Sequence, residues 1–372
     1  MTIEPKSPIE ADRPSIFDYP MPALREWLGQ HGHPSYAAAQ LYQWLYRKRA
    51  RNFGEMTNLS KSLRGELEAH FALQIPEIAS RQEDQADGAV KALFRLPDGE
   101  GVETVVMPYY SEKIQTQPRT GKVNKREPSE SEEYTICLST QAGCQFGCRF
   151  CASGRSGWKR NLTAGEIVAQ VLAFLWEGKN ITHAVFMGTG EPLHNLNALR
   201  DAIDILCAKE GLGLSSRRLT VSTVGLVPEI YRIALEDWKV KLAASLHATT
   251  DESREKLMPL ARAYQIDQLM DALRFYQRRN GRRISLEYLL IDGVNDRPKD
   301  AERMKKLMEG LLCHVNIIPC NKVGEFPYRP PSHDKIQTFK KLLLQYHIDA
   351  TVRYSRGRNI DAACGQLRLR HE

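Results

Sequence analysis

The sequence lacks any hydrophobic run long enough to cross a membrane. Its longest apolar stretch, around Ile167–Trp176, is far shorter than the roughly 20 residues that a membrane helix needs. The opening segment, Met1–Pro14, is polar, contains prolines and has no apolar core of the kind found in secretory signals. We therefore expect a cytoplasmic protein that has no membrane partner. We also expect it to act as a monomer.

The sequence also lacks the dispersed cysteines of a secreted disulfide protein. Three of its eight cysteines fall within Cys144–Cys151, a spacing that favours metal ligands or redox thiols. Lys and Arg exceed Asp and Glu by 52 to 45, and the resulting charge of +7 permits a polyanionic partner. The length of 372 residues and the 42% hydrophobic content suit one sizeable α/β domain with a smaller appended one.

Three stretches of the chain carry different patterns. Residues 1–80 contain short helical patterns, among them Ala37–Tyr46, and predict a small helical accessory domain. Residues 81–133 combine a β-hairpin around Pro97–Gly99 with a polar segment, Ser111–Glu133, that has too little apolar surface to order itself and is expected to be a mobile loop. Residues 134–372 form the main domain.

In the main domain, strand-like runs alternate with helical patterns. A capping box from Thr163 to Glu166 and Pro228 mark two helix starts. This alternation predicts an α/β fold with a partial (β/α)6-type barrel, in which functional residues gather at the carboxyl ends of the strands. The expected strands are Tyr134–Thr140, Ile181–Gly188, Arg218–Gly225, Val240–Ala248, Ile284–Ile291, His314–Asn321 and Ala350–Ser355.

Cys144, Cys148 and Cys151 are spaced C-x3-C-x2-C in a glycine-containing loop after the first of these strands. A structural zinc site normally uses four protein ligands and a ferredoxin run supplies four cysteines, so three cysteines leave one metal position open. The alternatives are small buried side chains or a zinc site completed from elsewhere. With Phe150 before the last cysteine, the motif resembles the radical S-adenosylmethionine (SAM) superfamily, which implies a 4Fe-4S cluster on these three thiolates.

Further candidate residues follow later strands. Taken singly, each is more often structural, but beside the cysteine triad they resemble the superfamily's SAM contacts. The glycine-rich turn Phe186–Leu193 lets a ligand approach the backbone, and its glutamate can accept a hydrogen bond from an ammonium group. The expected SAM-binding residues are Gly190, Glu191, Ser222, Ser245, Leu246, His247 and Asn321.

Two more cysteines narrow the resemblance. Cys364 lies after the last expected strand, and Cys137 lies seven residues before the triad. With them the whole chain, and in particular the helical front part, resembles the RlmN/Cfr family of radical SAM RNA adenine methyltransferases. The resembling segments are Gln141–Cys144, Asn161–Thr163, Ser245–Ala248, Asp292–Asp296 and the tail that bears Cys364.

The resemblance implies a reaction that uses two SAM molecules per turnover and an electron donor such as flavodoxin or ferredoxin. Cys364 would take a methyl group from the first SAM, with its thiolate as nucleophile. The second SAM would supply a radical that activates this methyl group for addition to adenine. Cys137 would then release the product by attacking the sulfur of Cys364, and Glu103 would take the ring proton. Alternatively, Cys137 is a buried strand residue without a catalytic role, and Glu103 is a solvated carboxylate on the surface.

RNA is the substrate that the resemblance implies: 23S rRNA, possibly with tRNA, methylated at adenine carbon 2. The front part of the chain resembles the housekeeping branch of the family, whereas the antibiotic-resistance branch acts at carbon 8. Thr189 stands where that family usually has methionine, and Ser111–Glu133 is longer than expected. Cations and stacking faces for RNA are offered by Arg47–Arg51 beside Trp44 and Tyr46, and by Arg353, Arg356, Arg358, Arg368 and Arg370.

Three other functions remain open from the sequence. The chain could be a carbon-8 methyltransferase of the resistance type, or a radical SAM enzyme of another reaction in which Cys137 and Cys364 are incidental. It could also be a non-catalytic iron-sulfur protein that binds RNA or assists ribosome assembly, which would need the basic surface but neither accessory cysteine.

Overall fold

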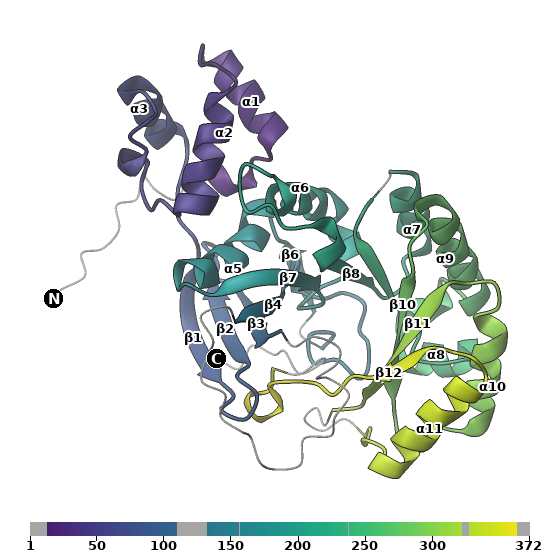
Figure 1. Cartoon of the computed structure of the whole chain (residues 1–372). Coiled ribbons are helices and arrows are strands. Elements are labelled where there is room, and N and C mark those ends of the chain that lie inside the picture. Colours follow the sequence, from purple (N-terminus) through teal and green to yellow (C-terminus); the bar gives the residue numbers. More distant parts are fainter. Residues whose placement is uncertain (1–12, 110–131, 156, 237, 322–326, 363–372) are drawn as a thin grey trace.

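The computed structural model describes residues 13–109, 132–155, 157–236, 238–321 and 327–362. Ten strands form one sheet in the order β1-β2-β3-β4-β7-β8-β9-β10-β11-β12 (Figure 1). Strands β1, β2 and β3, which connect the helical part to the barrel, lie at one edge, and β12 lies at the other. Among the described residues, no helix is both long and apolar enough to cross a membrane. The predicted Ser111–Glu133 loop falls almost entirely outside the described residues.

The amino-terminal part is helical, as predicted. Ser60 caps α3 by accepting a hydrogen bond from the Leu63 backbone N–H at 3.1 Å. Buried apolar side chains on each helix, such as Leu24 and Leu28, pack together because they recur at helical spacing. The elements are η2 (Ile16–Asp18), α1 (Met21–Gln30), α2 (Ala37–Tyr42), the π-turn η3 (Gln43–Lys48), η4 (Phe53–Glu55) and α3 (Lys61–His70).

The basic run after α2 mainly joins this helical part to the barrel. The Arg47 Nε donates to the Gly211 carbonyl at 3.0 Å, and Arg49 donates to the Leu175 carbonyl. Arg51 lies over the Trp176 ring at 4.5 Å. These contacts occupy part of the basic run, but Arg47 and Arg51 remain exposed, so the RNA role of the run stays a prediction. Tyr46 was wrongly expected to stack on RNA, since it is 1% exposed.

The connector is a three-stranded antiparallel extension of the main sheet. The predicted hairpin consists of β2 (Val90–Arg95) and β3 (Gly101–Pro108), and β1 (Glu77–Glu83) pairs with β2. On its other side β3 pairs antiparallel with β4 (Glu133–Cys137), so the connector and the barrel share one sheet. The boundaries at residues 80 and 133 stay a prediction.

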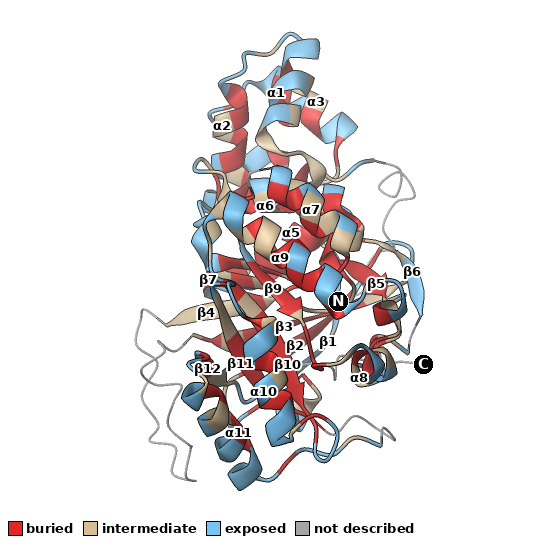
Figure 2. Cartoon of the chain, turned by 90° about the vertical axis from the view of Figure 1, so that its right-hand side faces the viewer, coloured by how far each residue is buried: buried red, intermediate tan, exposed pale blue. Residues whose placement is uncertain are grey.

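The remaining strands run parallel to β4 and form the predicted partial barrel. Helices follow most strands, and Figure 2 shows buried residues through the strands and along faces of the helices around them. The strands are β7 (Asn180–Phe186), β8 (Leu219–Thr223), β9 (Lys241–Ser245), β10 (Ile284–Leu290), β11 (Cys313–Pro319) and β12 (Ala350–Val352).

The barrel helices begin where the sequence signals predicted. Thr163 and Glu166 form the capping box of α5, and Pro228 lies in the first turn of α7. A separate two-stranded sheet, β5 (Gln141–Gly143) with β6 (Trp158–Asn161), brackets the cysteine loop. The helices are α5 (Ala164–Trp176), α6 (Leu196–Cys207), α7 (Val227–Leu235), α8 (Asp251–Leu257), α9 (Ile266–Asn280), α10 (Pro298–Leu307) and α11 (His333–Gln345), with short turns η5 (Pro192–Asn195), η6 (Ser216–Arg218), η7 (Pro259–Arg262) and η8 (Arg358–Ile360).

A buried amide fastens the end of β4 to helix α5. Gln170, 1% exposed, accepts from the Ser139 N–H at 2.9 Å and donates to the Ser139 carbonyl at 2.9 Å. Its oxygen also accepts from the Thr104 hydroxyl at 2.6 Å. The Ser139 hydroxyl in turn donates to the Glu103 carbonyl and accepts from the Thr189 N–H. This network fixes β3, β4 and the glycine-rich turn relative to one another.

Replacing Gln170 by leucine should destabilise the fold measurably. Q170L keeps the apolar volume but leaves the buried Ser139 amide and carbonyl without their partner, which costs about 1–3 kcal/mol for each unsatisfied group. Thr104→Val removes a single hydrogen bond and should cost less. Urea unfolding of the cluster-free proteins measures both losses. A Q170L protein as stable as the wild type would show that the network does not hold this region.

Candidate functional site

The cysteine triad lies in a tight loop between β5 and β6. Gly143 has φ +74°, and a Cβ there would lie 1.8 Å from the Gly157 carbonyl oxygen, so this position admits only glycine. The Cys144 N–H donates to that same carbonyl at 2.9 Å, and the Cys151 N–H donates to the Cys148 carbonyl at 3.1 Å. The backbone thus holds all three cysteines in one turn.

The thiols of the loop are close enough to influence one another. Burial raises the pKa of Cys144 to about 11; a backbone hydrogen bond from Phe146 opposes this rise, and the charges of Cys151 and Glu191 add to it. Within the described ranges, no three His, Cys, Asp or Glu side chains converge on a single metal ion. A 4Fe-4S cluster does not require the three thiolates to converge on one point, because each thiolate binds a different iron atom. Three partly buried, mutually interacting thiols fit that donor set.

The glycine-rich turn packs directly against the start of β5. Gly190 has φ +106°, and a Cβ there would lie 2.6 Å from the Gln141 side chain. Glu191, 1% exposed, accepts from the Val224 N–H at 2.8 Å and from the Leu193 N–H at 3.1 Å. Burial raises its pKa to about 7, while these bonds oppose the rise. Glu191 therefore ties two strand ends together, and only its remaining lone pairs are left for a ligand.

The predicted SAM-binding residues in β8 and at the end of β9 differ in which of their groups a ligand can contact. Ser222 and Ser245 are half-buried, in β8 and at the last position of β9. Leu246 is 0% exposed, so its side chain belongs to the core and only its backbone can touch a cofactor. His247 has φ +54°, a conformation that is costly for a side chain with a Cβ and is often found at functional sites.

The His247 ring is a neutral donor. Its Nδ1 accepts from the Leu289 N–H at 3.0 Å, which places the ring proton on Nε2. Burial, and to a smaller extent the positive charge of Arg254, lower its pKa to about 3. The ring of Phe150, beside Cys151, stands edge-on to it with centroids 4.9 Å apart. The cysteine loop and the end of β9 are therefore in contact.

Asn321 follows β11, which lies two strands along the sheet from β9 and next to the edge strand β12. Its Nδ2 donates to the Ser355 hydroxyl at 2.9 Å. It borders a cleft of about 400 Å³ that is also lined by Tyr354 and Arg358. Cys320, directly before it, is 5% exposed.

Glu103 and Cys137 lie on the same face of the connector sheet. Cys137 is the last residue of β4 and pairs with Val105, two positions along β3 from Glu103. Glu103 is 5% exposed, and its Oε1 lies 3.2 Å from the Lys91 Nζ. A solvated carboxylate, the alternative reading of Glu103, is thus ruled out by its burial.

The carboxyl-terminal tail returns to this same face. The Asn359 side chain donates to Asp84 at 3.0 Å and the Gly357 N–H donates to Asp87 at 2.9 Å, so the tail is fastened to the turn between β1 and β2 (Figure 1). Ala362 packs with Val105, and Cys137 packs against this pair. Cys364 itself, with Arg368 and Arg370, lies outside the described residues.

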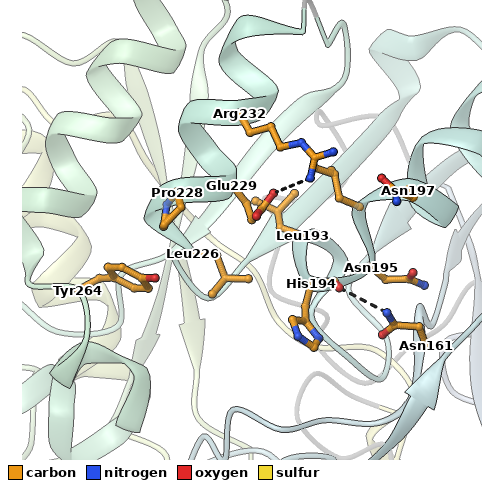
Figure 3. A pocket seen from close by; sticks show the side chains of 11 residues that line it. Asn161, Leu193, His194, Asn195, Asn197, Leu226, Pro228, Glu229, Arg232 and Tyr264 are labelled. Atoms are coloured by element: carbon orange, nitrogen blue, oxygen red, sulfur yellow. Dashed lines mark hydrogen bonds and ion pairs between the residues drawn. The ribbon is translucent and has the colours of Figure 1, made fainter.

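A separate cleft of about 300 Å³ lies beyond the glycine-rich turn. Its wall includes His194, whose Nδ1 and Nε2 lie 2.9 and 3.0 Å from the side-chain nitrogens of Gln141 and Gln145. Glu229 and Arg232 form an ion pair at 3.5 Å on the far wall (Figure 3). None of the predicted site residues lines this cleft, so we assign it no role in the site.

Two buried cations of the site escaped sequence reasoning. Lys91 is 9% exposed beside Glu103, and Arg254 is fully buried near the cysteine loop. Nothing in their local sequence predicts burial, because a lysine in a strand and an arginine in a helix are ordinarily solvated. Lys91 is buried by the pairing of β2 with β3, and Arg254 is buried by the packing of α8 against the barrel.

Two family models match the chain. Residues 138–305 match the radical SAM superfamily, and residues 15–73 match the ribosomal RNA large subunit methyltransferase N-terminal domain. Together they cover the helical part and the barrel from the end of β4 into α10.

Curated relatives and a solved structure match nearly the whole chain. A probable dual-specificity RNA methyltransferase RlmN of Lysinibacillus sphaericus is 42% identical over 95% of this chain and 88% of its own length. The protein of that name from Bacillus subtilis is 41% identical over 97% of this chain and 95% of its own. The crystal structure of a radical SAM methyltransferase from Sphaerobacter thermophilus superposes with a TM-score of 0.85 at 43% identity, covering 95% of this chain and 99% of that one.

The Lys91–Glu103 pair should be strongly coupled in stability. Lys91→Met leaves a buried carboxylate without its ammonium partner and should cost about 3–5 kcal/mol of unfolding free energy. Adding Glu103→Gln removes that carboxylate's charge, so the double variant should regain part of the loss. Denaturant unfolding of the wild type, both single variants and the double variant measures the coupling. Purely additive losses would contradict it.

Proposed function

The chain belongs to the family of the radical SAM RNA methyltransferases RlmN, and on that premise we propose that it methylates an adenine ring carbon in RNA, preferably carbon 2, through a methyl group carried on Cys364. Membership of the radical SAM superfamily implies a 4Fe-4S cluster and SAM. The observation that carries the proposal is the tail: Ala362, two residues before Cys364, packs with Val105 beside Cys137.

Cys144, Cys148 and Cys151 are the proposed cluster ligands. Gly190, Glu191, Ser222, Ser245, Leu246, His247 and Asn321 are the proposed SAM contacts, Leu246 through its backbone. When bound, the cluster and two SAM molecules per turnover supply the methyl group and the radical chemistry. The neutral His247 ring supports this assignment, since its Nε2–H is a donor at the end of β9.

The remaining steps belong to the chain's own thiols and carboxylate. Cys364 accepts the methyl group as a thiolate, and the transferred carbon then links its sulfur to adenine. Cys137 attacks that sulfur, which forms a Cys137–Cys364 disulfide and breaks the sulfur–carbon bond; the carbon keeps the electron pair, takes up a proton and leaves as the methyl group of the product. Glu103 takes the ring proton. Burial of Glu103 on the face that also carries Cys137 supports this role.

The RNA substrates are proposed from the relatives. A large-subunit ribosomal RNA methyltransferase domain supports 23S rRNA, and the name "dual-specificity" of the relatives supports tRNA as a second substrate. The target adenine must leave its stack to reach the site. We further propose that the protein is a cytoplasmic monomer and that flavodoxin or ferredoxin supplies its electrons.

Cysteine variants test the proposal. Cys364→Ala should abolish adenine methylation while iron content and RNA binding stay at wild-type levels. Cys137→Ala should accumulate a covalent protein–RNA adduct that survives denaturing electrophoresis, because product release needs its thiol. Reconstituted proteins are incubated with SAM, reductant and 23S rRNA fragments, and the nucleosides are analysed by mass spectrometry.

Cys207→Ala is the matched control, since Cys207 ends the outer helix α6 and should leave methylation unchanged. Undiminished methylation by Cys364→Ala would overturn the methyl-cysteine route. An 8-methyladenosine product would instead correct the position on the ring. Iron and RNA binding with no methylation by the wild type would favour a non-catalytic RNA-binding protein.

A further inference from the structure

Arg254 in α8 is a buried cation that has no ion-pair partner among the described residues. Its side chain is 0% exposed. Its guanidinium donates to the carbonyls of Val224 at 2.8 Å, Tyr264 at 3.2 Å and Ser245 at 3.3 Å, while the Nε is buried without a partner. A buried charge is costly unless an opposite charge balances it. The carbonyls supply only partial charges.

The surrounding chain leaves room for this guanidinium. Gly225 has φ +104°, and a Cβ there would lie 2.9 Å from the Arg254 Nη2. Val224 and Ser245, two of its three acceptors, lie just after β8 and at the end of β9, where the proposed SAM contacts also lie. The position is therefore shaped for a guanidinium at the active end of the barrel.

The same helix touches the cysteine loop. Cys148 packs in one apolar cluster with Leu257 and Met258, and the Arg149 N–H donates to the Leu257 carbonyl at 2.9 Å. Arg254 lies one turn of α8 before Leu257 and Met258, and both Arg254 and Cys148 are buried. The guanidinium and the cysteine loop therefore share one poorly solvated region.

We propose that Arg254 is a positioning residue of the iron-sulfur site, whose buried charge balances the anionic cluster and raises its reduction potential. A 4Fe-4S cluster with three thiolates is anionic, and its negative charge grows by one when a low-potential reductant adds an electron. A fixed nearby cation therefore stabilises the reduced form more than the oxidised form. The inference rests on the proposed ligation by Cys144, Cys148 and Cys151, which the iron content of Cys148→Ala tests separately.

The midpoint potential of the cluster in the full-length holoprotein tests this role. Arg254→Gln removes the charge but keeps an amide donor, and Arg254→Lys keeps the charge. Without SAM or RNA, a dithionite titration followed by electron paramagnetic resonance should give R254Q a midpoint more negative by at least about 59 mV, a tenfold change in the one-electron equilibrium. R254K should stay closer to the wild type.

Arg262→Gln is the matched control. Arg262 lies in the adjacent turn η7, but its side chain is 71% exposed and paired with Glu255 at 2.6 Å, so solvent should screen its charge. A wild-type potential in R254Q, or equal shifts in R254Q and R254K, would overturn the proposal. If R254Q fails to load iron, loading by R254K supports the charge role, and failure of both overturns it.

Discussion

Hydrogen bonds from the tail to Asp84 and Asp87 connect the two edges of the open sheet. The barrel is open, with the connector strands at one edge and β12 at the other. The tail leaves β12, and its attachment to the turn between β1 and β2 brings it to Cys137 and Val105. Residues that are far apart in the sequence therefore become neighbours, and the proposed thiol chemistry depends on this closure.

Two electrostatic environments lie on the two sides of the barrel opening. On the connector side, Glu103 is buried with a lysine as its partner. On the cysteine side, Arg254 is buried and hydrogen-bonds to backbone carbonyls, with no ion pair within the described part of the chain and only the more distant charge of Asp251 on its own helix. In the first arrangement the cation faces a carboxylate at contact distance, whereas the second leaves a positive charge for an anionic group. The different partners of the two cations match the different chemistry proposed for each side.

The sequence predicted the parts of the fold that have local signals. The order of the parallel strands, the α5 capping box and the hairpin around Pro97–Gly99 follow from apolar periodicity and turn residues. Strand β1 was missed because its segment, EIASRQE, is largely polar and exposed. The contacts of the basic run with the barrel could not be predicted, because the partners of Arg47 and Arg49 lie more than 120 positions away in the chain. Long-range burial of a polar side chain leaves no local pattern.

The central claim is methylation of an adenine ring carbon, and RNA from cells tests it most directly. The chain would be expressed in bacteria that lack their own adenine-carbon methyltransferase, and nucleosides from 23S rRNA and tRNA would be measured by mass spectrometry. The account predicts that 2-methyladenosine appears with the wild-type chain and is absent with the Cys364→Ala variant. Soluble, iron-containing wild-type protein that yields no ring-methylated adenosine in either RNA would contradict it.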